Sequence, residues 1–453
     1  MKKGLIFVIV LTMLISSSLI GCSGKTDNSS NAATPSNNAT ATSNDTTVVT
    51  EPAKDVNLNF TMRSAPETVA FKKLAEMYTA QYPNVKIAIN EVGSDGYFTR
   101  ITSELFAKSK GIDIVNFTNV ELGMFAASGV IENLTPYLDN SNLNLNGFNK
   151  DMFVKAALES STYDGNVYAL PYGISCLLLY YRTDLIKTPP QDWDEYLALE
   201  KQFTKSINPN SPTEYGGVMM AKRGQMAPKV FSAFLRSYGG EFDPENINNQ
   251  GAVDALTLWV DEFANLKVVP PDSNATDYSK GVQTFQEGLS AMALQQDAAA
   301  GTFADQTKSP KIFDKFAVTT IPGKKQADGS IKKVTYTQSW AFAINSFSEN
   351  KEEAYKFLTF FNNPENYSKA MGSSDSTALK DVINSDAFKN SHKSNYDAYV
   401  NSFEFAKAFP TNKYTSDFFN ILDFDISKAL AKELTPKQAL DEASAEMTKA
   451  MKE

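Results

Sequence analysis

Between residues 56 and 115 the spacing of apolar residues alternates between the period of a strand and the period of a helix. Apolar and polar residues alternate at residues 56–60 and 85–89, which predicts half-buried strands, and residues 112–115 predict a third strand. A helical stripe separates the first two strands and is formed by Phe71, Leu74, Ala75 and Tyr78. This order of β-α-β units predicts an α/β fold with a parallel-type sheet covered by helices.

Two later segments predict strands of a different kind. Residues 167–181 form an apolar and aromatic run that contains Pro171 and Gly173. Because proline and glycine disfavour a helix interior, we expect an extended segment that crosses the molecule. Residues 340–344 predict a further, fully buried strand.

Two four-residue motifs mark expected helix starts. Residues 64–67 (SAPE) and 435–438 (TPKQ) each place Ser or Thr three positions before Glu or Gln, with Pro in between. This is the pattern of a capping box, in which the two side chains satisfy free backbone N–H groups. We therefore predict that a helix begins at each motif.

The composition excludes several classes of function. The 453-residue chain has a formal net charge of -9 and lacks the basic footprint of a nucleic-acid-binding protein. Its single histidine, His392, argues against histidine-rich metal sites and most catalytic triads. It contains no P-loop motif, so it is not the ATPase of a transport system. We expect no metal, no other cofactor and no nucleic-acid partner.

The N-terminus predicts an export signal and a lipid anchor. A basic start precedes an apolar run at residues 5–20, and residues 19–22 read LIGC. This segment resembles the lipobox of bacterial lipoproteins, which implies a signal peptide over residues 1–21 and acyl chains, such as palmitate, on Cys22. Two alternatives stay open, an uncleaved membrane span and a signal peptide with an incidental cysteine.

The segment after Cys22 is expected to be a polar tether. Residues 23–54 are dominated by Ser, Thr, Asn and Ala, which cannot bury enough apolar surface to order the chain. An anchor at Cys22 and a tether over residues 22–54 would hold the folded part at the outer face of a cell membrane. The Lys-rich, Arg-poor composition favours a Gram-positive cell. Cys176 is then expected to be a lone, buried thiol.

Five collinear stretches resemble those of a known family. They are residues 111–115 (GIDIV) with 125–131 (FAASGVI), 165–172 (GNVYALPY) with 179–185 (LYYRTDL), 189–195 (PPQDWDE), 285–292 (FQEGLSAM), and 339–344 (SWAFAI) with 350–358 (NKEEAYKFL). In this order they resemble the extracellular solute-binding lipoproteins of ABC importers, in the sugar-binding branch that includes the maltodextrin-binding proteins. The resemblance covers roughly residues 55 to 453.

The resemblance implies a monomeric protein with two α/β lobes, a hinge, and an interlobe cleft that closes on a solute. Residues 55–172 with 338–388 would form lobe 1, and residues 175–333 with 392–453 would form lobe 2. The closed, loaded form would deliver the solute, a carbohydrate, to membrane permease subunits. No bond is made or broken in this function, so the protein is not expected to be an enzyme.

The resemblance also points to candidate ligand-binding residues in the cleft. They are Arg63, Phe117, Asn119, Glu121, Tyr172, Ser175, Lys229, Asp297, Gln338, Ser339, Trp340 and Phe419. Aromatic side chains would bind sugar rings, and carboxylate, amide and hydroxyl groups would bind sugar hydroxyls. Ser175, Lys229 and residues 295–298 depart from the family pattern, which leaves the solute open, an acidic oligosaccharide and a non-sugar included.

Structural roles remain open for several of these residues. Tyr172 could pack at the hinge, and Trp340 and Phe419 could belong to the core. Glu121 could serve its own helix N-terminus, where a carboxylate is favourable, and Arg63 could lie at the surface. Trp193 and Trp259 are expected to be structural.

Two rival functions also remain open. A surface glycosidase or other polysaccharide-acting enzyme needs only two carboxylates at the right separation, which this sequence does not exclude. A sensor-associated binding lipoprotein would use the same fold with a signalling partner.

Overall fold

The computed structural model describes residues 54–65, 67–224, 226–371 and 376–452. Its internal contacts divide the chain into residues 1–52 and residues 53–453, and all elements described here belong to the second unit. Cys22 and the predicted signal peptide and tether, up to residue 53, lie outside the described residues. No helix within the described ranges is long and apolar enough to cross a membrane.

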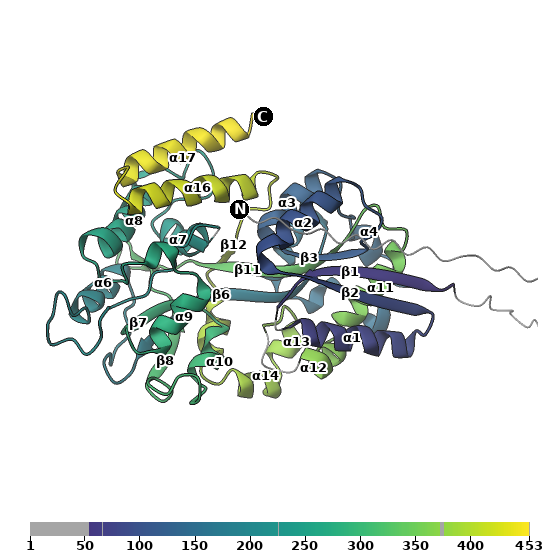
Figure 1. The fold of residues 1–453 in the computed structure, drawn as a ribbon, viewed down its shortest axis with the longest axis horizontal. Helices are drawn as coiled ribbons and strands as arrows, with labels where there is room; N and C mark the ends of the chain where they lie inside the picture. Colours follow the sequence, from purple (N-terminus) through teal and green to yellow (C-terminus); the bar gives the residue numbers. More distant parts are fainter. Residues whose placement is uncertain (1–53, 66, 225, 372–375, 453) are drawn as a thin grey trace, which may run out of the picture. The chain divides into compact units, whose positions relative to one another are not determined.

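The principal sheet of this unit has eight strands (Figure 1). They are β1 (Val56–Arg63), β2 (Val85–Val92), β3 (Ile114–Thr118), β6 (Leu170–Arg182), β7 (Met292–Gln296), β8 (Phe316–Thr320), β11 (Thr335–Ile344) and β12 (Ala406–Ala408). Their order is β2-β1-β3-β11-β6-β7, with β12 paired to β11 and β8 paired to β6. Two small hairpins are formed by β4 (Thr162–Tyr163) with β5 (Asn166–Val167) and by β9 (Lys324–Lys325) with β10 (Ile331–Lys332).

Helices flank the sheet at both of its ends (Figure 1). Those before β6 are α1 (Thr68–Gln81), α2 (Ser94–Phe106), α3 (Asn119–Ala127), α4 (Thr135–Leu138) and α5 (Lys155–Glu159). Those between β6 and β11 are α6 (Trp193–Gln202), α7 (Met226–Ser237), α8 (Gln250–Val260), α9 (Tyr278–Gln286) and α10 (Ala299–Phe303). Those after β11 are α11 (Lys351–Phe361), α12 (Pro364–Met371), α13 (Lys380–Ile383), α14 (Asp386–Ser391), α15 (Tyr396–Ser402), α16 (Thr415–Leu430) and α17 (Pro436–Ala450). Short 3-10 or π turns are η1 (Leu145–Gly147), η2 (Lys150–Met152), η3 (Asp261–Asn265) and η4 (Ser273–Ala275).

Successive side chains of a strand point to opposite faces of the sheet. The side chains around β1 and β3 therefore form two core layers, one on each face. On β1, Leu58 and Phe60 are buried on the face covered by α1 and α11. On β3, Phe117 is buried on the opposite face with Phe125 of α3. The parallel pairing of β1 with β2 and with β3 confirms the predicted β-α-β order.

A separate apolar cluster packs helices α6, α7, α8, α16 and α17 together. Trp193 of α6 and Trp259 of α8 are each 1% exposed, which confirms their expected structural role. The ring of Trp193 stacks on Phe234 of α7 at 3.9 Å between centroids. Hydrophobic burial of such large aromatic side chains is the main stabilising term in a core of this kind.

Two strands, β6 and β11, contribute side chains to the cluster around β1 and to the cluster around Trp193. Residues 170–176 of β6 pair with β11, whereas residues 177–182 pair with β7 and β8. The end of β11 near Ile344 pairs with β3, and its start near Thr335 pairs with β12. Figure 1 shows both strands running through the middle of the unit. The predicted extended crossing at residues 167–181 is therefore confirmed, while the predicted lobe boundaries stay a prediction.

Two local expectations are wrong. The third strand begins at Ile114 rather than at residue 112. The Asn59 N–H of β1 donates to the Asp113 carboxylate at 2.7 Å, so a side-chain oxygen takes the place of a backbone acceptor there. The capping box at residues 64–67 does not form, because the Ser64 hydroxyl donates to Glu91 at 3.1 Å and Glu67 is itself the helix N-cap. The box at Thr435 and Gln438 is confirmed.

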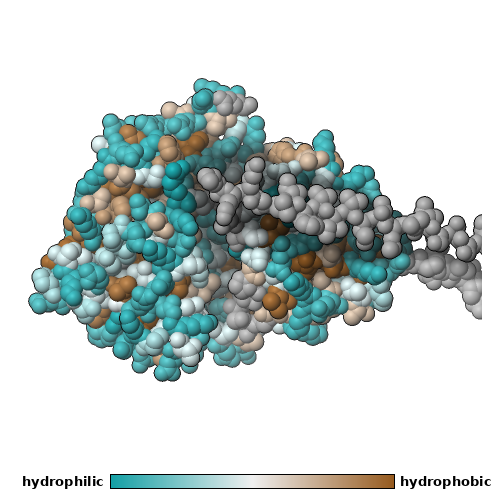
Figure 2. Space-filling view, in the orientation of Figure 1, coloured by the Kyte–Doolittle hydropathy of each residue, from teal (hydrophilic) through white to brown (hydrophobic). Residues whose placement is uncertain are grey.

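Hydrophobic and hydrophilic residues are mixed over the face shown in Figure 2. Large apolar side chains that are exposed come from distant parts of the chain, such as Val69, Ile207, Phe313 and Phe424. Scattered apolar residues of this kind are normal for a protein surface.

Candidate functional site

A cavity of about 280 Å³ lies where β6 and β11 meet. The residues that line it come from both halves of the chain and are Glu67, Tyr172, Gly173, Ile174, Ser175, Gln296, Ala298, Trp340, Met371 and Ser376. Of the predicted site residues, Tyr172, Ser175 and Trp340 are thereby brought together. Concave sites with a few convergent polar groups are the usual form of a small-molecule site.

A β-bulge shapes this cavity. Trp340 pairs with Gly173 and Ala341 pairs with Pro171, so that Tyr172 is an extra residue on β6. A bulge bends its strand and redirects neighbouring side chains, and bulges are common next to functional sites. The bulge places Trp340 and Ser175 along one wall of the cavity, on two adjacent strands.

Trp340 lies half-buried between two other side chains. The ring of Phe98, from α2, stacks near it at 6.3 Å between centroids and an angle of 25°. The guanidinium carbon of Arg63 lies 4.6 Å from the centre of the indole. Arg63 is also 3.6 Å from the carboxylate of Glu67. The end of β1 and the start of α1 thus place a cation and a carboxylate beside the aromatic ring.

Asp297 is 3% exposed and lies directly behind the cavity wall. Its Oδ1 accepts hydrogen bonds from the Ser175 hydroxyl at 2.5 Å and from the Cys176 N–H at 3.0 Å, and its Oδ2 accepts from the Ser376 hydroxyl at 3.0 Å. Burial raises the pKa of Asp297 above its ordinary value, and these three hydrogen bonds oppose the rise. Asp297 contacts two residues that line the cavity rather than lining it itself.

Tyr172 has its ring in the core although it borders the cavity. The ring stacks on Phe342 at 4.3 Å between centroids, and the phenol oxygen accepts from the Asn116 amide at 3.1 Å. Burial raises the pKa of Tyr172 well above its ordinary value. The ring of Tyr172 therefore packs in the core, and its predicted role in binding stays a prediction.

Asn119, Ser339 and Gln338 lie at the junction of α3 with β11. The Asn119 side chain accepts from the Ser339 N–H at 3.3 Å and donates to the Thr337 carbonyl at 3.5 Å. The Ser339 hydroxyl donates to the Gly173 carbonyl at 3.4 Å, and Gln338 is 8% exposed. These contacts connect the start of α3 to the two crossing strands.

Glu121, on α3, and Lys229, on α7, are not among the residues that line the cavity. Glu121 accepts from the N–H and hydroxyl of Thr118, so it completes a capping box on its own helix. Burial lowers the pKa of Lys229, while the negative charge of Glu121 raises it and the positive charge of Arg63 lowers it further.

Phe117 and Phe419 lie in the core and outside the cavity. Both have 0% of their surface exposed. Phe117 contacts Phe125 at 5.2 Å, and Phe419 stacks on Phe242 at 5.2 Å with an angle of 14°. Their rings offer no free face to a solute, because the strand and helix periods turn them inward.

The sequence interpretation did not identify Glu67, Met371 and Ser376 as lining residues. Glu67 had been assigned to a capping box, and Ser376 follows α12 in a segment that carries no motif. Gln296 and Ala298 belong to the stretch already recognised as a departure from the family pattern. Among the described residues, no group of three or more His, Cys, Asp or Glu side chains could hold a metal ion.

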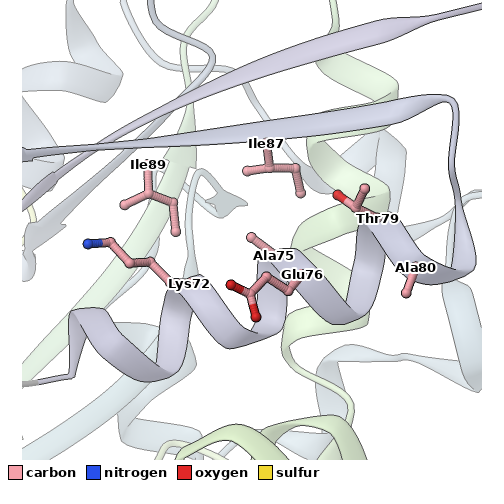
Figure 3. A pocket seen from close by; sticks show the side chains of 7 residues that line it. All are labelled: Lys72, Ala75, Glu76, Thr79, Ala80, Ile87 and Ile89. Carbon is pink, nitrogen blue, oxygen red and sulfur yellow. The ribbon is translucent and has the colours of Figure 1, made fainter.

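A larger hollow, of about 510 Å³, lies between α1 and β2 and is more open than the cavity. Figure 3 shows Ile87 and Ile89 pointing from the strand toward the helix, which contributes Lys72 and Glu76. Lys72 is paired with Glu91 at 2.5 Å. This groove lacks an aromatic ring among its lining residues, so we place the site at the crossing strands instead.

Solved structures share the fold. Maltose-bound T. maritima MalE3 matches with a TM-score of 0.74 and 22% identity, over 87% of this chain and 99% of that chain. An ABC substrate-binding protein from Listeria monocytogenes in complex with cycloalternan matches with a TM-score of 0.72 and 21% identity, over 88% and 99% of the two chains. The predicted α/β, two-lobe binding-protein fold is confirmed by this likeness.

Comparison of the sequence with known proteins also finds solute-binding proteins. The maltotriose-binding protein of Pyrococcus abyssi is 23% identical over 334 residues, which cover 72% of this chain and 66% of that protein. The match therefore spans about two thirds of the length of that relative. The model of the family described as bacterial extracellular solute-binding protein matches residues 64–368. Since this range is more than half of the 453 residues, the chain belongs to the family of bacterial extracellular solute-binding proteins.

Proposed function

We propose that this protein captures an oligosaccharide in the cavity beside the paired strands β6 and β11, and delivers it to the permease subunits of an ABC importer. The observation that carries the proposal is the half-buried Trp340 indole beside Glu67, Ser175 and Ser376. An aromatic face binds the apolar face of a sugar ring, while carboxylate and hydroxyl oxygens bind its hydroxyls. Three similar proteins support this class of solute: one is a maltotriose-binding protein, and two have structures with bound maltose and cycloalternan.

We also propose that binding works by closure of two lobes about the crossing strands. A solute that contacts both lobes binds the closed form better and shifts the population toward it. No bond of the solute is made or broken. The relatives named above are binding proteins, and Glu67 is the one carboxylate among the described residues that line the cavity, whereas glycoside hydrolysis needs two.

The proposed location is the outer face of a Gram-positive cell membrane, where the protein is a monomer held by a lipid on Cys22. The family is extracellular by its description. Two acyl chains are sufficient for stable anchoring, whereas one is marginal.

A thermal-shift screen tests the proposed solute. The full chain, in detergent, is heated with maltose, maltotriose, acidic oligosaccharides, amino acids and peptides. A solute at about one hundred times its Kd adds roughly 2.7 kcal/mol, which raises the Tm of a protein of this size by about 3 °C. We expect the shift with neutral oligosaccharides and a reduced shift in Trp340→Ala. A shift with amino acids or peptides alone would exclude the carbohydrate.

A further inference from the structure

The carboxylate of Asp297 fixes the direction of two hydrogen bonds at the cavity wall. A carboxylate can only accept, so the hydroxyls of Ser175 and Ser376 must both donate to it. The Cys176 N–H, which also binds Oδ1, is a donor that cannot reverse. Three donors on one carboxylate are the arrangement that favours its ionised form.

Each serine hydroxyl has one hydrogen and two lone pairs. Since Ser175 and Ser376 direct their hydrogens at Asp297, only their lone pairs remain for a molecule in the cavity that both residues line. Glu67, on the same wall, is an acceptor as well when ionised. A solute that donates hydrogen bonds satisfies these oxygens, whereas a solute carboxylate would place acceptor against acceptor.

We propose that Asp297 is a positioning residue that sets the Ser175 and Ser376 hydroxyls as paired acceptors, so that the site selects its solute by donor groups such as adjacent sugar hydroxyls. The solute class rests on the proposed function, and the role of Asp297 rests on the hydrogen bonds alone. The proposal favours neutral over acidic oligosaccharides.

The surroundings hold this network in one geometry. The Asp297 carbonyl accepts from the Tyr180 hydroxyl at 3.0 Å and from the Asn395 amide at 3.0 Å. The Ser376 carbonyl accepts from the Tyr367 hydroxyl at 2.9 Å. Both ends of the Asp297–Ser376 hydrogen bond are thus anchored by groups outside the cavity, and preorganised acceptors need no reordering when a solute binds.

A test without any solute uses carboxyl ¹³C NMR on the full chain in detergent. The Asp297 signal is the one lost in Asp297→Asn. Ser175→Ala and Ser376→Ala each remove one donor, so each should raise the pKa of Asp297. Ser376→Thr keeps a hydroxyl at this position and should leave the pKa of Asp297 as in the wild type. Ser330→Ala, which removes the donor to exposed Asp328, is the matched control and should leave Asp297 unchanged. An unchanged Asp297 pKa in both alanine variants would overturn the proposal.

A second test uses maltose binding by calorimetry between about pH 4.5 and 8. In Asp297→Asn the amide donates to one serine, which then presents its hydrogen to the cavity, and we expect about tenfold weaker binding. Wild-type binding should weaken as acid protonates Asp297, and this dependence should be smaller in the variant, where other groups such as His392 still titrate. Asp314→Asn, an exposed residue, should behave as wild type.

The outcomes separate the two proposals. Unchanged affinity in Asp297→Asn, or an acid dependence as large as that of the wild type, would contradict the role of Asp297. If maltose and maltotriose do not bind the wild type, malto-oligosaccharides are excluded as the solute. The NMR result then decides the role of Asp297 by itself.

Discussion

At the scale of single residues, Trp340 is central to the proposed function because its half-buried indole lines the cavity, whereas the ring of Tyr172 lies in the core. Trp340→Ala should weaken maltose binding about tenfold, since it removes a stacking surface worth about 1 kcal/mol beyond area burial. The free energy of unfolding should fall by only about 1 kcal/mol, because the half-buried indole packs beside Arg63 and Phe98 at the edge of the cavity. Calorimetry and urea unfolding measure the two quantities.

Trp340→Phe is the control for this prediction. It keeps an aromatic face at the same place and should retain most of the affinity. Undiminished maltose binding in Trp340→Ala would remove Trp340 from the site.

A second residue-scale prediction concerns two buried glutamates far from the cavity, Glu200 on α6 and Glu262 in η3. They are 0% and 3% exposed. Burial raises the pKa of Glu262 to about 8, and burial with the charge of Glu262 raises the pKa of Glu200. The folded protein therefore holds protons that the unfolded chain releases above about pH 4.5, so stability falls as pH rises from there toward 8.

Glu262→Gln should remove part of this dependence, because an amide stays neutral at every pH. We expect the loss of unfolding free energy between about pH 5 and 8 to shrink by about 1–3 kcal/mol, as measured by urea unfolding. Glu245→Gln, at an exposed position, should keep the wild-type slope. A wild-type protein equally stable at both pH values would contradict the prediction.

At the scale of elements, α3 approaches the segment before α16 so closely that one helix position must be glycine. A Cβ on Gly123 would overlap the carbonyl oxygens of Thr411 and Asn412. Gly123→Ala should cost about 1–3 kcal/mol, because backbone must move to admit it. Gly96→Ala is the matched control on α2, where a Cβ meets nothing within 4 Å, and it should be neutral or stabilising by about 0.5–1 kcal/mol. Urea unfolding that ranks the two variants equally would contradict the close approach.

Elements whose pattern is local were predictable from the sequence. Residues 167–181 read as an extended crossing because Pro171 and Gly173 interrupt any helix, and β6 follows that reading. The two capping boxes show the limit. Thr435 has its partner Gln438 within one turn, whereas Ser64 finds a competing partner in Glu91, 27 residues away. Such long-range competition does not appear in a four-residue motif.

At the scale of the whole molecule, the fold followed from the order of segments, but the cavity did not. Its wall combines residues from β6, β11, the N-terminus of α1 and the segment after α12, brought together by pairing over more than a hundred residues. Tyr172 and Trp340 were predictable because they lie within family motifs, and Ser175 because it stands at a cleft position where this chain departs from the family pattern. Glu67 and Ser376 were not, since Glu67 reaches the cavity from the start of α1 and Ser376 through its hydrogen bond to Asp297, and neither contact belongs to a local motif.

The two cysteines of the chain allow the proposed anchor to be tested with an internal control. Cys22 follows the apolar run and precedes the polar segment, whereas Cys176 is a free thiol with 0% exposure on β6. Cys22→Ala should release the protein from membranes into the soluble fraction, because the proposed thioether-linked lipid forms on the cysteine of the lipobox-like segment. Cys176→Ala should stay with the membranes and lose at most about 1 kcal/mol of stability from the core. Fractionation and immunoblotting of both variants measure this, and membrane retention of Cys22→Ala would show that the N-terminal segment holds the protein as an uncleaved span.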